Sequence, residues 1–208
     1  MSEESESEER INIMTLGNST VGKSSFIVRF TENQFQETYL ATVGIDFKVK
    51  TVTIKEKNYK LFFYDTTGQE KYKSISLNII KNAHGIILMY DVTNRASFES
   101  IPDWIKSVKD AKGENFPMII LGNKMDMENK RIVKEEEGKQ IADEYNINFF
   151  ETSNLNGINV QEAGLGIVKK ILDKREKENT DNTDYNSNST SKLSSRRNTK
   201  VENKKKCC

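Results

Sequence analysis

The apolar residues of the chain gather in several short segments. Residues 11–17, 85–91 and 117–122 are rich in apolar side chains, and residues 148–151 form a shorter segment. Continuous apolar runs of this length, of which residues 85–91 are the clearest, are typical of strands covered on both faces of a parallel sheet. We therefore predict buried strands at the first three positions and a short strand at the fourth.

A different pattern covers the segment between residues 45 and 65. Residues 45–54 (IDFKVKTVTI) alternate between apolar and polar with a period of two, and residues 59–65 (YKLFFYD) follow closely. Such alternation predicts a half-buried strand, and two strands in close succession form a hairpin. We place the hairpin turn at Lys57 and Asn58.

Helical spacing is found between these strands. Residues 23–31 are predicted to form a helix, and residues 160–172 give the clearest amphipathic pattern of the chain. Two further segments carry apolar residues at helical spacing: Phe98, Ile101, Trp104, Ile105 and Val108 in the first, and Ile141, Ala142 and Tyr145 in the second. Pro102 fits a first helical turn better than a helix interior.

The order of these segments predicts the fold class. Strands that alternate with helices build an α/β domain with a mostly parallel sheet, to which the hairpin adds one antiparallel strand. We expect a sheet of six strands and about five helices within residues 11–176, which is enough chain for one domain with a sizeable core. The acidic residues 1–10 are expected to be disordered, and the Asn-, Ser- and Lys-rich residues 177–208 to form a flexible tail.

The charge of the chain is segregated into its ends. The formal net charge is +1, but residues 1–10 carry −4, the last twenty residues carry +6, and the body between them carries −1. A neutral body argues against a protein that binds nucleic acid through a basic face. The two cysteines, Cys207 and Cys208, end the chain, so no disulfide framework is expected in the body. The apolar runs are far too short to span a membrane, so membrane contact is expected only through the C-terminus.

A phosphate-binding loop is predicted after the first strand. Residues 17–24 (GNSTVGKS) match the pattern G-x-x-x-x-G-K-[ST] and precede a predicted helix. A loop in this position wraps a polyphosphate with its backbone N–H groups, and the helix N-terminus adds a partial positive charge. Lys23 is expected to supply a cation to the outer phosphates, and Ser24 a hydroxyl to Mg²⁺.

A second phosphate-side motif begins at the end of the hairpin, where residues 65–69 read DTTGQ. Asp65 is expected to be a further contact to Mg²⁺. Gly68 can turn its peptide toward a γ-phosphate, and Gln69 can orient an attacking water without a shifted pKa. Gln69 and Lys23 are therefore candidate catalytic residues.

A base-binding motif follows the strand at residues 117–122. Residues 123–126 read Asn-Lys-Met-Asp, and the Asp126 carboxylate can accept hydrogen bonds from the N1–H and the exocyclic amine of guanine. Adenine presents a lone pair at N1 and no amine at that carbon, so this carboxylate rejects ATP. Asn123 can join neighbouring loops, and the stem of Lys124 can lie against the base. Residues 151–154 are expected to offer backbone N–H groups to the guanine carbonyl.

Together these strings resemble the Ras superfamily of small GTPases, and more narrowly the Rab family, over residues 11–175 and at the C-terminus. The matching strings are GNSTVGKS, ATVGIDF at residues 41–47, YDTTGQEKY, YDVTN, GNKMD, FFETS and the terminal Cys-Cys. The resemblance implies the P-loop small GTPase fold, with GTP or GDP bound together with Mg²⁺. It implies that Thr42 binds Mg²⁺, senses the γ-phosphate and joins the catalytic residues, that Phe35 stacks on the base, and that Tyr39 closes over the phosphates.

The resemblance also implies the full set of site residues. The metal ligands are Ser24, Thr42 and Asp65. The nucleotide-binding residues are Asn18, Ser19, Thr20, Val21, Gly22, Lys23, Ser24, Ser25, Phe35, Tyr39, Thr42, Gly68, Asn123, Lys124, Asp126, Ser153, Asn154 and Leu155.

Four departures from the family pattern bear on this site. Thr20 stands where Rabs usually carry Gly, and its β-branched side chain is expected to stiffen the phosphate loop. Thr67 replaces the Ala of DTAGQE and is expected to slow hydrolysis or hinder the switch, the alternative being a neutral change. Asn154-Leu155 replaces the usual Ala-Lys. Tyr64 replaces the usual Trp, and residues 78–81 (NIIK) replace a tyrosine pair and Arg, so the effector surface is altered.

The C-terminus resembles a Rab ending. Lys204, Lys205 and Lys206 precede Cys207 and Cys208, and the resemblance implies geranylgeranylation of both thiols. Two isoprenoids with a tail of charge +6 give stable anchoring. The implied location is the cytoplasmic face of an intracellular or plasma membrane, in exchange with the cytosol. The implied partners of the monomer are an exchange factor, a GTPase-activating protein, a GDP-dissociation inhibitor, a prenylation escort protein and effectors.

The function predicted from the sequence is a membrane-anchored GTP/GDP switch that regulates vesicle trafficking and hydrolyses GTP slowly without an activator. One alternative is a nucleotide-binding scaffold with impaired hydrolysis, suggested by Thr20, Thr67 and Asn154. Another is a P-loop nucleotide kinase, which needs an acceptor site and an Arg-rich lid that the body does not show. His84 and Trp104 are interpreted as structural residues.

Overall fold

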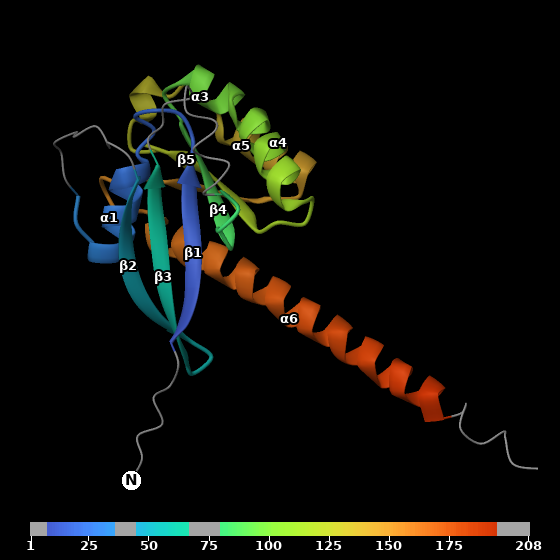
Figure 1. Cartoon of the computed structure of the whole chain (residues 1–208). Coiled ribbons are helices and arrows are strands. Elements are labelled where there is room, and N and C mark those ends of the chain that lie inside the picture. Colours follow the sequence, from blue (N-terminus) through green and yellow to red (C-terminus); the bar gives the residue numbers. More distant parts are fainter. Residues whose placement is uncertain (1–7, 36–44, 67–79, 195–208) are drawn as a thin grey trace, which may run out of the picture. The chain divides into compact units, whose positions relative to one another are not determined.

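The computed structural model of the chain describes residues 8–35, 45–66 and 80–194, with side chains except those of Ile45 and residues 181–194 (Figure 1). The chain divides into two compact units, Met1–Ile171 and Leu172–Cys208. Among the described residues, no helix combines the length and apolar character that a membrane span requires.

A six-stranded sheet runs through the described part of the first unit in the order β2-β3-β1-β4-β5-β6 (Figure 1). Only β2 is antiparallel to its neighbour, as the hairpin predicted. The strands are β1 (Glu9–Leu16), β2 (Ile45–Ile54), β3 (Lys57–Thr66), β4 (Gly85–Asp91), β5 (Met118–Asn123) and β6 (Asn148–Thr152). The expected six-stranded, mostly parallel α/β fold is thereby confirmed.

The helices lie in the segments that the apolar spacing indicated. They are α1 (Lys23–Glu32), α3 (Arg95–Glu99), α4 (Ile101–Lys112), α5 (Glu135–Tyr145) and α6 (Val160–Ser194), with a 3₁₀ turn at Glu128–Lys130. The apolar series that begins at Phe98 is divided between α3 and α4, which meet at Ser100. Pro102 lies in the first turn of α4, as predicted, where the helix needs no N–H from it.

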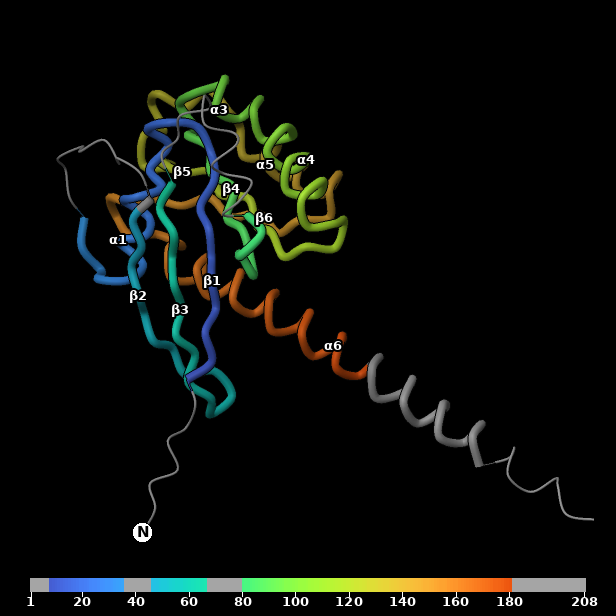
Figure 2. The backbone as a smooth tube through the Cα atoms, in the orientation of Figure 1, coloured from blue at the N-terminus to red at the C-terminus, as the bar shows by residue number. Residues whose placement is uncertain are grey.

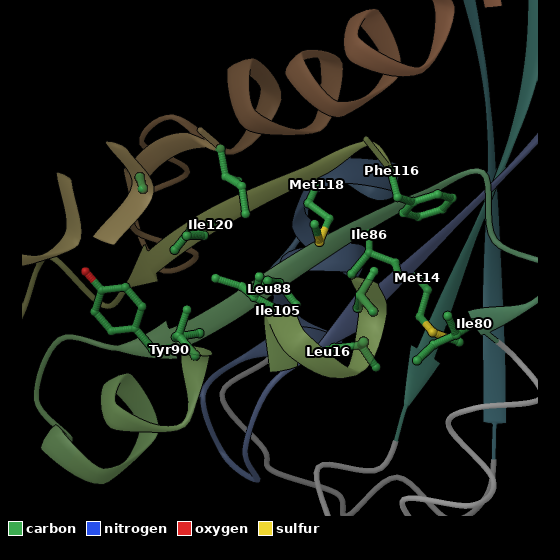
Figure 3. Packing of buried hydrophobic residues seen from close by; sticks show 14 of the residues in the cluster. Met14, Leu16, Ile80, Ile86, Leu88, Tyr90, Ile105, Phe116, Met118 and Ile120 are labelled. Carbon is green, nitrogen blue, oxygen red and sulfur yellow. The ribbon is translucent and has the colours of Figure 1, made fainter. Parts of the chain in front are cut away.

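Helices cover both faces of the sheet. On one face, side chains of β1, β4 and β5 pack against α4 and α5, and Figure 3 labels several of them: Met14, Leu16, Ile86, Leu88, Tyr90, Ile105, Met118 and Ile120. On the other face, the Phe30 ring of α1 lies 4.9 Å from the Phe63 ring of β3. Gly164 of α6 lies so close to the Phe30 ring that a Cβ on Gly164 would be 2.2 Å from a ring carbon. Strand β4 is buried along its whole length, in accord with its uninterrupted apolar sequence.

The hairpin turn lies two residues earlier than the sequence indicated. Ile54 pairs with Lys57, and Lys55 and Glu56 form the turn with φ values of 49° and 65°. Positive φ at both central residues is the type I′ geometry, whose twist matches that of the strands. The turn was predicted at Lys57 and Asn58 because Asn commonly occupies such turns. The prediction was wrong because the register of the two strands pairs both residues and leaves the charged Lys55 and Glu56 in the turn.

The first strand begins within the segment predicted to be disordered. Glu9 and Arg10 pair with β3. The Arg10 guanidinium lies 3.9 Å from the centre of the Phe62 ring and donates a 2.7 Å hydrogen bond to the Tyr64 hydroxyl. These contacts offset the polar character of the two residues, for which the prediction of disorder was wrong. Residues 1–7 lie outside the described part of the chain.

Helix α6 continues past the expected domain boundary at residue 177 and ends at Ser194. A helix satisfies its own backbone hydrogen bonds, and Lys174 and Glu178, 3.6 Å apart, add an ion pair at the favourable i,i+4 spacing. The start of the tail is therefore helical, and the expectation of irregular chain from residue 177 needs correction there. The flexibility of the tail stays a prediction, and residues 195–208 lie outside the described ranges.

The buried hydroxyl of Tyr90 gives a first testable prediction. Tyr90 is fully buried, its hydroxyl oxygen makes no hydrogen bond, and burial raises its pKa. Because an unpaired buried polar group is destabilising, Tyr90→Phe should leave the free energy of unfolding in urea unchanged or raise it by up to about 1 kcal/mol. Tyr90→Leu is the control, because it also removes the ring that packs on Phe98 and should be destabilising. A loss above about 1 kcal/mol for Tyr90→Phe would reveal a partner of the hydroxyl.

Candidate functional site

The candidate phosphate loop, residues 17–22, joins the end of β1 to the start of α1 at the edge of the sheet where the parallel strands end (Figure 2). Gly22 is the N-cap of α1 with φ 101°, and no side chain caps the helix. The first turn of α1 also carries no acidic residue. The partial positive charge of this helix end is thus not offset by a capping side chain or by an acidic residue in the first turn, which favours binding of an anion.

Lys23 is folded back over the phosphate loop. Its side chain is 5% exposed, and its ammonium donates to the carbonyl oxygens of Gly17 at 2.9 Å and Asn18 at 2.8 Å. These bonds hold the cation at the concave side of a loop whose N–H groups can bind phosphate. The role predicted for Lys23, a cation for the outer phosphates, stays a prediction.

Two residues of the α3–α4 region also hold the phosphate loop. The Asn18 side chain donates to the Ser100 hydroxyl at 3.1 Å and accepts from the Trp104 indole N–H at 3.2 Å. Trp104 therefore does more than pack. No local pattern in the sequence indicates this contact, because Asn18 and Trp104 are 86 residues apart.

The indole bond can be tested by a double-mutant cycle. Trp104→Phe keeps an aromatic ring but removes the donor, and it should speed GDP dissociation by about threefold because one loop contact is lost. The same substitution in an Asn18→Ala background should have a clearly smaller effect, since the acceptor is already gone. If Trp104→Phe changed the rate of GDP dissociation equally in both backgrounds, the smaller ring and not the lost hydrogen bond would be the cause.

Thr20 stands in a backbone conformation that suits glycine. Its φ is 64°, and its hydroxyl donates to the Ser19 carbonyl at 2.7 Å. The left-handed region is strained for residues with a Cβ, and most of all for β-branched ones. Thr20 therefore carries local backbone strain, and the stiffening of the loop stays a prediction.

The strain at Thr20 predicts that Thr20→Gly is stabilising. The free energy of unfolding of the nucleotide-free protein in urea should rise by about 1 kcal/mol, because relief of strain exceeds the entropy that glycine loses. Thr20→Ala is the matched control, since it removes the branch but keeps a Cβ in the left-handed region. Equal stability of the Gly and Ala variants would argue against backbone strain.

The candidate base site is formed by the loops after β5 and β6. Asn123, which ends β5, donates to the Val21 carbonyl of the phosphate loop at 2.8 Å and accepts from the Thr152 hydroxyl at 3.3 Å. Lys124 follows with φ 69° and forms a 2.6 Å ion pair with Asp91 at the end of β4. Asn123 thus joins two loops, as predicted, and the Lys124 stem is held in place by its charged end.

Asp126 is oriented by the neighbouring loop. Its Oδ1 accepts a 2.5 Å hydrogen bond from the Ser153 hydroxyl, which in turn accepts from the Asn156 backbone N–H. The Met125 N–H donates to the Thr152 carbonyl at 3.2 Å, so the two loops are also joined through their backbones. A fixed carboxylate at this point has the chemistry required to select guanine.

The remaining part of the base site is held by α1. Arg29 donates to the carbonyl oxygen of Asn154 at 2.8 Å and to that of Leu155 at 2.5 Å. Its guanidinium carbon also lies 5.9 Å from the centre of the Phe35 ring. Arg29 therefore brings the residue expected to stack on the base toward the loop expected to contact the guanine carbonyl. Arg29 is not identifiable from the sequence as a site residue, because its position is simply a polar one on a surface helix.

The residues present fit a magnesium ion. Thr66 donates to the Thr15 carbonyl at 2.7 Å, and Thr15 donates to the Tyr64 carbonyl at 3.2 Å, so the ends of β1 and β3 are fastened together. This places Asp65, which is 8% exposed, beside the strand that leads into the loop with Ser24. A hydroxyl and a carboxylate are hard oxygen donors of the kind that Mg²⁺ prefers.

Several predicted site residues cannot be placed. They lie outside the described ranges and are Tyr39, Thr42, Thr67, Gly68, Gln69, Cys207 and Cys208. His84, in contrast, is seen to be structural, because its Nδ1 accepts a 2.9 Å hydrogen bond from the Asn12 backbone N–H.

Comparisons with known proteins agree with this geometry. The model of the Ras family matches residues 12–173. Ras-related protein Rab-13 of Rattus norvegicus is 42% identical over 186 residues, which are 89% of this chain and 92% of the relative. Ras-related protein Rab-3 of Caenorhabditis elegans is 44% identical over 78% of this chain and 74% of its own, and Ras-related protein Rab-8B of Dictyostelium discoideum is 41% identical over 77% and 79%. The chain therefore belongs to the Ras family and is a Rab-type small GTPase.

Proposed function

We propose that the chain is a membrane-anchored switch that binds GTP and GDP with Mg²⁺, hydrolyses GTP and acts in vesicle trafficking. The observation that carries the proposal is that the loop with Asp126, the carboxylate expected to select guanine, is joined to the candidate phosphate loop through Asn123. Asp126 is held by Ser153, and Asn123 of the same motif donates to Val21. One edge of the sheet thus carries both the candidate base site and the candidate phosphate site, which supports the proposal.

Each described residue has a defined task in binding. Asp126 accepts hydrogen bonds from the N1–H and the amine of guanine, and Phe35 stacks on the base. Lys23 and the N-terminus of α1 stabilise phosphate charge. Ser24 and Asp65, together with Thr42, would hold Mg²⁺, which would supply positive charge to offset that of the phosphate oxygens.

Hydrolysis is assigned to Gln69 of the second phosphate-side motif, residues 65–69, which orients the attacking water. Thr42 and Gly68 hold the two segments that contain them while a γ-phosphate is present. Loss of the γ-phosphate releases both segments. We expect slow intrinsic turnover and a partner that contributes the missing positive charge, which is the usual means of acceleration in this reaction class.

The trafficking role rests on the Rab relatives and on the C-terminus. The relatives cover most of the chain, and the basic tail ends in Cys207 and Cys208. Prenylation of both thiols, with charge attraction to anionic lipid, anchors the protein to the cytoplasmic face of a membrane. Exchange factor, activating protein, dissociation inhibitor, escort protein and effectors follow by analogy. Replacing both cysteines by Ser should abolish membrane binding in cells, and retained binding would refute prenylation as the anchor.

The nucleotide is identified by releasing it from the purified, denatured protein. We expect guanine nucleotide, and recovery of ATP or ADP would overturn the proposal. Asp126→Asn should lower GDP affinity by about 100-fold or more, because the carboxylate that accepts both guanine donors is lost. The same variant should gain affinity for xanthosine diphosphate, whose C2 oxygen can accept from the new carboxamide. Thr20→Ala serves as a site control that should keep the preference for guanine.

A nucleotide-binding scaffold with impaired hydrolysis is the second candidate, because Thr20 is strained and Thr67 departs from the family pattern. Single-turnover hydrolysis of GTP, with and without an activator, distinguishes it from the switch. Thr67→Ala should raise the rate if the hydroxyl hinders catalysis. Equal rates for the variant and the parent protein would remove that functional reading of Thr67.

A further inference from the structure

Two carboxamides from the base site donate to consecutive carbonyl groups of the phosphate loop. Asn123 donates to the Val21 carbonyl at 2.8 Å, and Asn154 donates to the Gly22 carbonyl at 2.9 Å. Gly22 is packed between them, since a Cβ on Gly22 would lie 2.3 Å from the Asn123 Nδ2 and 2.9 Å from the Asn154 Nδ2. The side chain of Asn154 thus touches the phosphate loop directly, although only its backbone was expected to act.

The contact with Asn154 fixes the direction of a backbone N–H. A peptide group is planar and trans, so its N–H points opposite to its C=O. The Gly22 carbonyl faces Asn154 and also accepts from the Phe26 N–H at 2.9 Å. The N–H of Lys23 belongs to the same peptide plane. It must therefore point away from the loop with Asn154, toward the side on which the candidate phosphate loop would bind phosphate.

Asn154 is itself held in place from a second side. It is 4% exposed, and Arg29 donates to its carbonyl oxygen at 2.8 Å. Its side-chain Oδ1 is buried and makes no hydrogen bond. A buried acceptor without a partner is unfavourable, so the useful part of the carboxamide is its N–H₂ donor to Gly22.

We propose that Asn154 is a positioning residue that couples binding of the guanine base to binding of the β-phosphate. Base contacts order the loop that carries Asn154, and the carboxamide then keeps the Gly22–Lys23 peptide in its phosphate-binding orientation. This proposal rests on the proposed function, because it requires a guanine nucleotide in the site. It also assigns a role to the Asn154 side chain, the hydrogen bond to the Gly22 carbonyl, in addition to the contact expected between the backbone and guanine.

The test compares GDP and GMP, which differ only in the β-phosphate. Dissociation constants of both are measured by competition with a fluorescent GDP for the full chain and for Asn154→Ala. We expect the variant to bind GDP about fivefold more weakly and GMP less than about twofold more weakly, because the lost bond acts on the β-phosphate cradle. Asn156→Ala is the matched control: Asn156 is in the same loop, is exposed, and uses its backbone N–H for its hydrogen bond. It should change neither constant.

Equal weakening of GDP and GMP, or no weakening of either, would overturn the coupling role. Asn154→Leu is a second variant, which keeps the approximate side-chain volume but has no hydrogen-bond donor. It should also weaken GDP binding more than GMP binding. If the parent protein fails to bind GDP, or binds ADP as well as GDP, the proposed function fails together with this one. GDP binding by the parent with an unchanged GDP-to-GMP ratio in both variants overturns the coupling alone.

Discussion

Gly17→Ala is expected to prevent stable folding. A Cβ at Gly17 would lie 2.1 Å from the backbone carbonyl oxygen of Met89, and the φ of Gly17 is 143°. Met89 is in β4, which is completely buried and hydrogen-bonded to strands on both sides, so its backbone cannot move away. We expect the free energy of unfolding, measured in urea, to fall by more than about 4 kcal/mol, which exceeds half the stability of many domains.

Gly113→Ala separates the steric clash from the effect of backbone conformation. Gly113 also has a positive φ, 87°, but nothing lies within 4 Å of a Cβ built there. Its substitution should therefore cost only the conformational strain, about 1–3 kcal/mol, because φ 87° with ψ 168° is a region that residues with a Cβ rarely adopt. If the Gly17 and Gly113 variants proved equally stable, the close approach of the phosphate loop to β4 would not matter for folding.

This pair of glycines also illustrates what the sequence could reveal about the site. The spacing of Gly17, Gly22 and Lys23 carries the phosphate loop, because the chemistry requires those residue types at those intervals. Asp126 could be identified in the same way from the motif that contains it. Local motifs and apolar periods therefore sufficed to predict the six-stranded, mostly parallel α/β fold and to single out the candidate phosphate loop and Asp126.

The contacts that hold the site together were not predictable in this way. Arg29 and Asn154 are 125 residues apart, and Asn18 and Trp104 are 86 residues apart. Such contacts follow from tertiary packing. A single sequence has no periodic pattern or motif spacing from which contacts between such distant residues can be predicted. The wrong turn in the hairpin has the same origin, since the register of ten paired residues overrode the preference of Asn58 for a turn.

The other large effect is expected at the buried ion pair between Arg131 and Glu151. Arg131 donates to both carboxylate oxygens of Glu151, at 2.6 Å and 2.9 Å, and the hydrogen bond to Glu151 is the main reason that the pKa of Arg131 is raised. Glu151 is 7% exposed and lies in β6, directly before the loop with Ser153 and Asn154. The pair therefore fastens the strand that presents the base loop.

Arg131→Met is expected to lower the free energy of unfolding in urea by about 3–5 kcal/mol, because it leaves the Glu151 carboxylate buried without its cation. It should also speed GDP dissociation, since the strand before Asn154 loses its anchor. The double variant Arg131→Met/Glu151→Leu removes the stranded charge and should recover most of the lost stability, to within about 1 kcal/mol of the parent. Recovery would show that burial of an unpaired carboxylate causes the loss. A double variant as unstable as Arg131→Met would instead trace the loss to the remaining contacts of Arg131, its 2.8 Å ion pair with Glu128 and its hydrogen bond to the Val133 carbonyl.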